Sequence, residues 1–81
     1  MMVSTKGRYA LMILIDIAQN GEDEYIPLVD IANRQGLSMK YLELVVAMLN
    51  KGNLITSRRG KSGGYKLIKK PEEYNINEIL E

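Results

Sequence analysis

Apolar residues recur at helical spacing along the first part of the chain. Between Thr5 and Asn20 they fall three and four residues apart, as on one face of an α-helix. Ser4 is a residue type that caps helix N-termini, and Gly21 stands where a helix-ending glycine is common. The predicted core stripe of this helix is Ala10, Ile13, Leu14, Ile17 and Ala18.

Three more apolar residues of the same helix, Leu11, Met12 and Ile15, lie off that stripe. A helix that is apolar nearly all round needs cover on more than one side. We therefore expect another helix or a second subunit to pack against it.

Two shorter helices are predicted next, separated by a tight turn. The first spans about 28–35 and ends at Gly36, and its inward residues are Leu28, Ile31 and Ala32. Ser38 caps the second, which spans about 39–51 and ends at Gly52. Its core stripe is Leu42, Val45, Val46 and Leu49. Two helices joined by a short turn that contains glycine are typical of a helix-turn-helix.

The remaining pattern predicts a β-hairpin. Strands are expected over 54–59 and 65–69, around a glycine-rich turn at 60–64, and Pro71 ends the second strand. Tyr65 and Leu67 then share one face, and Lys66 and Ile68 share the other. Residues 25–27 are a further short extended stretch.

A last helix is predicted from about residue 76, capped by Asn75. The order of elements gives the fold class, which is mainly α with a small β-hairpin. We predict a winged helix-turn-helix with a three-helix core, a two-stranded wing and the start of a further helix at the C-terminus.

The charges are segregated along the chain, although the formal net charge is only +1. Residues 1–50 hold four basic and six acidic residues, and residues 71–81 hold four acidic residues and no basic one. Between them, residues 51–70 hold seven basic residues and no acidic one. Such a block is typical of a surface that faces an anion, and its alternative is a solvated charge run without a partner.

The composition removes several kinds of chemistry. The 81 residues suit a single domain and contain neither cysteine nor histidine. This excludes disulfides, Ser-His and Cys-His catalysis, and a cysteine-based zinc or iron–sulfur site within these residues. The carboxylates, lysines, tyrosines and serines suggest no converging catalytic pair, so we expect no enzyme.

The continuous apolar run at 9–15 is far shorter than the roughly 20 residues that a membrane-spanning helix needs. No signal-peptide cleavage site follows it. The expected location is therefore cytoplasmic, without a membrane partner.

The third helix has an outward face that suits DNA. Opposite its core stripe stand Lys40, Glu43, Leu44, Ala47 and Lys51. Lys40 can donate to guanine or to a phosphate, Glu43 can accept from a cytosine amino group, and Leu44 can contact a thymine methyl group. Glu43 also repels phosphate, which makes it a discriminator between sequences. The alternative is an ordinary solvated helix face.

The hairpin favours the DNA-binding interpretation. Arg58, Arg59 and Lys61 stand beside glycines, which let a backbone approach a phosphate closely. An arginine at the tip of a wing can enter a narrow minor groove, where the negative potential is enhanced. Lys6 and Arg8, at the start of the first helix, are candidates for contacts to the DNA backbone.

Gly60-Lys61-Ser62 matches the end of a phosphate-binding loop of the G-x-x-x-x-G-K-[ST] type. Its first glycine would fall at Ile55, and the loop would have to open a helix where the pattern predicts a strand. Both tests fail, so we expect no nucleotide-binding loop.

Five segments, in collinear order, carry a family resemblance. They are Ser4-Thr5-Lys6-Gly7-Arg8-Tyr9-Ala10, Ile31-Ala32 with Arg34-Gln35-Gly36-Leu37-Ser38, Tyr41-Leu42-Glu43, Arg59-Gly60 with Gly63-Gly64-Tyr65, and Pro71-Glu72-Glu73 with Ile76 and Glu78-Ile79-Leu80. Together they resemble the Rrf-type winged helix-turn-helix regulators, the family that includes IscR, NsrR and CymR.

This resemblance implies a homodimeric, sequence-specific transcriptional regulator, usually a bacterial repressor, that binds a double-stranded DNA operator. It implies a recognition helix at about 38–51 in the major groove and a wing at about 58–65 in the minor groove. The positions that it assigns to the recognition helix, the wing and the backbone-facing N-terminal motif are Ser38, Lys40, Tyr41, Glu43, Arg59, Lys6 and Arg8.

The chain also departs from the family pattern. Relatives often have glutamine at position 44, and Leu44 cannot pair with adenine as glutamine does. We therefore expect a different operator. Arg58 and Lys61 are basic residues beyond the family pattern, and they strengthen the electrostatic attraction of the wing.

Family members continue into a long dimerisation helix, and many hold a 2Fe–2S cluster on three cysteines beyond this point. Residues 1–81 are therefore expected to be a DNA-binding domain that stops before the dimerisation helix and has no cofactor or metal of its own. A cluster would belong to the full-length protein. A winged helix that contacts another protein without binding DNA stays open as the alternative.

Overall fold

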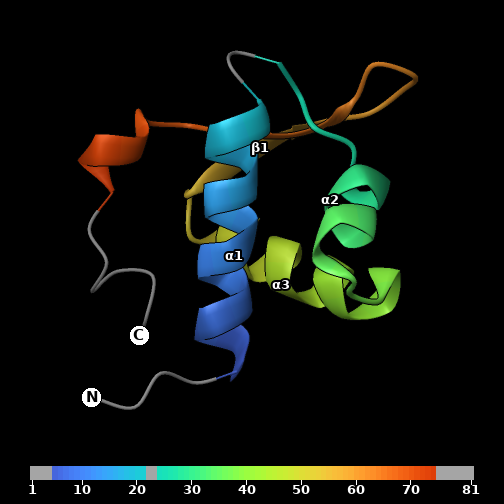
Figure 1. The fold of residues 1–81 in the computed structure, drawn as a ribbon. Helices are drawn as coiled ribbons and strands as arrows, with labels where there is room; N and C mark the ends of the chain where they lie inside the picture. The colour runs from blue at the N-terminus through green and yellow to red at the C-terminus, as the bar shows by residue number, and fades with distance from the viewer. Residues whose placement is uncertain (1–4, 22–23, 75–81) are drawn as a thin grey trace.

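The computed structural model describes residues 5–21 and 24–74. Three helices come first, α1 at Thr5–Asn20, α2 at Leu28–Gln35 and α3 at Met39–Lys51. Strands β1 at Ile55–Arg58 and β2 at Gly64–Leu67 follow, and then the short 3-10 helix η1 at Pro71–Glu73. The three helices and the hairpin of the predicted winged helix-turn-helix are confirmed (Figure 1). The predicted Ser4 cap and the helix from residue 76 lie outside the described residues.

The turn between α2 and α3 is built as the sequence predicts. Gly36 ends α2 in the left-handed conformation, with φ 66° and ψ 34°, and its N–H donates to the Ala32 carbonyl. Ser38 caps α3, because its hydroxyl oxygen accepts from the Tyr41 N–H at 3.2 Å. Such a cap stabilises a helix by about 1 kcal/mol, and it fixes where α3 begins.

The core is one cluster to which all three helices and β1 contribute. Its buried members are Ala10, Ile13, Leu14, Ile17, Ile26, Leu28, Ile31, Ala32, Leu42, Val45, Val46, Leu49, Leu54 and Ile55. The predicted core stripes are confirmed with one exception. Ala18 is only half-buried, because it lies one position beyond the buried face of α1.

The off-stripe side of α1 borders an apolar groove of about 300 Å³. Pro71 and Tyr74, which follow the hairpin, form part of its lining, so the chain after β2 covers some of this helix. Ile15 is nevertheless 53% exposed. The other lining residues are Leu11, Leu14, Ala18, Leu67 and Glu72.

The two strands are shorter than predicted. They pair antiparallel from Ile55 opposite Leu67 to Arg58 opposite Gly64. Tyr74 explains where the ladder ends, because its hydroxyl accepts from the N–H groups of Ile68 and Lys69 at 3.1 and 3.3 Å. The same hydroxyl donates to the carbonyl of Leu54 at 2.6 Å. Backbone groups that the prediction gave to the strands therefore bond to a side chain.

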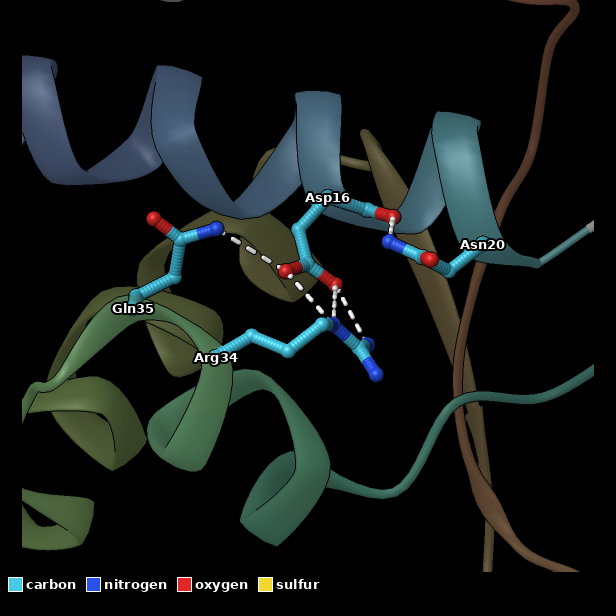
Figure 2. Close-up of polar contacts among 4 residues, drawn as sticks. All are labelled: Asp16, Asn20, Arg34 and Gln35. Carbon is cyan, nitrogen blue, oxygen red and sulfur yellow. Dashed lines mark hydrogen bonds and ion pairs between the residues drawn. The ribbon is translucent and has the colours of Figure 1, made fainter.

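A buried carboxylate joins α1 to α2, as Figure 2 shows. Asp16 is 2% exposed, and its carboxylate accepts from Arg34 Nε at 3.0 Å, Arg34 Nη2 at 2.6 Å and Gln35 Nε2 at 2.9 Å. The side-chain amide of Asn20 donates to the Asp16 backbone carbonyl at 2.9 Å. The last turn of α2, just before the helix-turn-helix turn, is thereby fixed against α1.

These contacts determine the pKa of Asp16. Burial alone raises it, but the hydrogen bonds from Arg34 and Gln35 and the positive charge of Arg34 outweigh burial, so the pKa lies below its usual value. A carboxyl whose pKa is lower in the folded state contributes stability above its unfolded-state pKa. That contribution is lost as the pH falls through the folded-state pKa.

The Asp16→Asn variant should therefore differ from wild type in a pH-dependent way. We expect a constant difference in the free energy of unfolding above about pH 5, and a shrinking difference below about pH 4, the usual range of an aspartate pKa. Urea unfolding at a series of pH values measures it. Glu72→Gln, at an exposed acid, is the matched control. A difference that did not change with pH would contradict this account of Asp16.

Candidate nucleic-acid interface

One face of α3 is free of the core. Leu42, Val45, Val46 and Leu49 are buried on the inner side. On the outer side Lys40, Glu43, Ala47 and Lys51 are exposed, and Leu44 is 60% exposed. The structure thus confirms the predicted outward face, and it adds Met39 and Met48, two exposed apolar residues that sequence reasoning missed. Met48 could have been predicted from the sequence, because it lies one helical turn after the exposed Leu44 and therefore on the same face of α3.

Two of the predicted contact residues also have structural roles. The Ser38 hydroxyl caps α3, and the Tyr41 ring packs edge-to-face on Tyr9 of α1, with centroids 5.0 Å apart and planes at 81°. Tyr41 is half-buried as a result. This aromatic pair joins the first turns of α1 and α3, so the exposed side chain of Arg8, next to Tyr9, belongs to the same region as the start of α3.

The hairpin presents basic side chains at its turn. Arg59 and Lys61 are exposed, and among the described residues neither makes a hydrogen bond or an ion pair. The turn is tight, because the Gly63 N–H donates to the Gly60 carbonyl at 3.0 Å and a Cβ at Gly63 would overlap the Arg58 carbonyl. Figure 1 shows the orange tip projecting from the helices, so both cations are available to an anion in solution.

Arg58 differs from Arg59 and Lys61 because it has an aromatic partner. Its guanidinium lies over the ring of Tyr25, 5.4 Å from the centroid, and the Lys66 ammonium lies 5.7 Å from the same centroid. Sequence reasoning did not single out Tyr25, because the contact forms between segments more than thirty positions apart. Both distances lie within the range of cation–π attraction.

The predicted site residues therefore form three groups. Lys6 and Arg8 are exposed in the first turn of α1, the outward face of α3 forms the second group, and the hairpin cations form the third. The cations of the first and third groups can neutralise phosphates, whereas the face of α3 offers two lysines, one carboxylate and apolar surface. The first and third groups therefore suit contacts to a nucleic-acid backbone, and the face of α3 suits contacts to base edges.

The chain matches the family model described as Rrf2, iron-dependent transcriptional regulator, over residues 3–81. It belongs to the Rrf2 family. Among curated Rrf2 relatives, the HTH-type transcriptional regulator IscR of Aliivibrio salmonicida is 40% identical over 80 residues, which are 99% of this chain and 48% of the relative. Protein rrf2 of Nitratidesulfovibrio vulgaris is also 40% identical, over 99% of this chain and 53% of that protein.

Solved structures of Rrf2-type proteins agree with the fold. CymR of B. subtilis, described as the global cysteine regulator of that organism, superposes with a TM-score of 0.91 at 38% identity, over 99% of this chain and 62% of CymR. IscR of T. potens superposes with a TM-score of 0.88 at 41% identity, over 99% of this chain and 58% of that protein. The chain spans about half the length of the curated relatives it matches.

The Rrf2 description names iron, and the donor set of this chain can be tested against it. Residues 1–81 contain no cysteine and no histidine, and the described residues hold no group of three acidic side chains placed to bind a metal ion. The described residues therefore do not fit an iron site, and residues 1–81 supply no cysteine or histidine ligand for an iron–sulfur cluster. No helix in the described ranges is long and apolar enough to cross a membrane.

Proposed function

We propose that this Rrf2-family chain is the DNA-binding part of a transcriptional regulator. The observation that carries the proposal is the hairpin tip, where Arg59 and Lys61 are exposed without partners among the described residues. Phosphates supply the negative charge that such side chains attract, and an enzyme would need converging catalytic groups instead. The regulatory names of the family and its members support the same conclusion.

In this proposal α3 enters the major groove and reads bases. Lys40 donates to guanine or to a phosphate, and Glu43 accepts from a cytosine amino group. Leu44 lies against a thymine methyl group, where its exposed apolar surface is removed from water. Ser38 and Tyr41 bind at the start of the helix, where their structural roles also hold the backbone in place.

The wing and the N-terminal turn add contacts that fix register. Arg59 enters the minor groove, and Arg58 and Lys61 bind the flanking phosphates. Lys6 and Arg8 contact the backbone from the first turn of α1. We further propose a cytoplasmic homodimer that occupies two half-sites about one helical turn apart, or a multiple of it, and represses by occupancy.

Arg59→Ala tests this assignment. We expect about tenfold weaker binding, because a lost charged contact is worth about 1–3 kcal/mol. The slope of log K against log salt should also become less steep, by no more than the roughly 0.9 of one phosphate contact, because a cation in the minor groove also displaces counterions from the DNA. The measurement is titration of the full-length protein on a 30-base-pair duplex selected from a random pool with the wild type.

The matched control is Lys70→Gln, which removes one positive charge at the exposed residue before η1. It should change affinity by less than about twofold, since a long-range charge effect is screened at physiological salt. Equal losses in the two variants would mean that only the net charge matters, and the wing assignment would be wrong.

A further inference from the structure

The connection between α1 and α2 adds a third strand-like segment to the wing. Ile26 pairs with Tyr65 of β2, and each N–H donates to the other residue's carbonyl at 2.8 Å. The approach is close enough to exclude a side chain at Gly64, because a Cβ there would overlap the Ile26 carbonyl. Figure 1 shows this teal segment running beside the hairpin before it enters α2.

This pairing decides which way Tyr25 faces. Ile26 and Tyr65 are directly paired, so their side chains lie on the same face of the wing. Because side chains alternate along a strand, Tyr25 and Lys66 both lie on the opposite face. The hairpin register places Arg58 opposite Gly64, on the face of Lys66. Three separate segments therefore bring one aromatic ring and two cations together, in agreement with the 5.4 and 5.7 Å from the ring centroid to the two charges.

The ring orders the cations without using up their hydrogen-bonding capacity. The donors of a guanidinium lie in its plane, so an arginine over an aromatic face keeps its N–H groups for a phosphate. The lysine ammonium likewise has donors that do not face the ring. Since Arg58 and Lys66 repel each other, the negative face of the Tyr25 ring also favours holding both on one surface.

We propose that Tyr25 is a positioning residue for DNA binding, which holds Arg58 and Lys66 ready on one face of the wing; this inference rests on the proposed function. Long basic side chains lose rotamer freedom when they bind a phosphate. A ring that has already restricted them reduces that cost. Lys66 thereby becomes a DNA-contact residue in addition to those named above, and Tyr25 acts through it and Arg58.

The test compares Tyr25→Leu with Tyr25→Phe in the full-length protein, on the duplex selected for the Arg59 experiment. Leucine keeps apolar bulk and removes the ring, whereas phenylalanine keeps the ring and removes the hydroxyl. We expect Tyr25→Leu to bind about two- to fivefold more weakly, the value of an exposed cation–π contact, and to show a smaller salt slope. Tyr25→Phe should match the wild type in both.

A second comparison separates positioning from a purely structural role. In a protein that already carries Arg58→Gln and Lys66→Gln, Tyr25→Leu should cause no further loss of affinity. An equal loss in that background would overturn the proposal, because Tyr25 would then act through the fold. Thermal unfolding midpoints of every variant accompany the binding data.

The remaining outcomes are also decisive. Unchanged affinity in Tyr25→Leu, with a wild type that binds the duplex, would overturn the positioning role and leave the proposed function intact. Tighter binding would overturn it as well, because the ring would then withhold the cations from DNA. A wild type that bound no duplex from the pool would overturn the proposed function and this inference with it.

Discussion

Replacing Arg34 by alanine is expected to lower the free energy of unfolding by about 2–4 kcal/mol. The variant removes the guanidinium that donates to both carboxylate oxygens of Asp16 and leaves that buried charge with Gln35 as its remaining side-chain donor in the described contacts. The upper part of the usual 3–5 kcal/mol range is not expected, because the Arg34 side chain is 39% exposed and water can enter the space it leaves.

Chemical unfolding at pH 7 measures this loss. The double variant Asp16→Ala/Arg34→Ala should be more stable than Arg34→Ala alone, since removing both partners leaves no buried charge unpaired. Arg8→Ala, at an exposed arginine of α1, is the matched control and should change stability by less than about 0.5 kcal/mol. If Arg34→Ala cost no more than Arg8→Ala, the ion pair would have no part in holding α2 on α1.

Gly64→Ala is expected to lower the free energy of unfolding by about 2–4 kcal/mol and to loosen the wing. Gly64 has φ 144°, which side-chain-bearing residues rarely adopt, and the new methyl group would overlap backbone atoms of Ile26 and Pro27. The pairing of Ile26 with Tyr65 would then have to open, and its two backbone hydrogen bonds contribute about 1 kcal/mol each.

The variant Gly60→Ala separates the cost of a positive φ from the cost of the steric overlap. Gly60 also has a positive φ, 108°, but a Cβ there would meet open space. We therefore expect it to show the conformational cost alone, about 1–2 kcal/mol, with fast amide exchange restricted to the turn. In Gly64→Ala the amide of Ile26 should lose its protection as well. Equal stability losses and equal exchange patterns would mean that the close approach at Gly64 contributes nothing.

The helices and the turn between them could be predicted because the signals are local. Helical spacing of the core residues, a serine at the start of α3 and a glycine at the end of α2 all act within a few positions. The outward face of α3 follows from the same periodicity, since a buried stripe that includes Leu42 and Val46 leaves Leu44 on the other side.

What the sequence did not reveal depends on pairs of distant residues. Asp16 stands among the buried positions of α1, and its partners are 18 and 19 positions away. The Tyr74 hydroxyl, which ends the strand ladder at Ile68 and Lys69, also bonds to the Leu54 carbonyl 20 positions away. Tyr25 contacts cations that the hairpin brings to it from more than thirty positions away. A carboxylate one residue before Ile17 in an apolar stripe was a usable signal, because a buried charge requires a partner.

The pairing of Ile26 with Tyr65 has a mechanical consequence for reading DNA. Only Pro27 separates Ile26 from the first residue of α2. The bridge between Ile26 and Tyr65 therefore restricts rotation of the hairpin relative to the helix-turn-helix. In the proposed complex the distance between the major-groove and minor-groove contacts would then be set before binding. The protein would then bind only operators in which the two contacted DNA regions have the matching separation. Inserting one base pair between these two DNA regions should weaken binding even when every contacted base is kept.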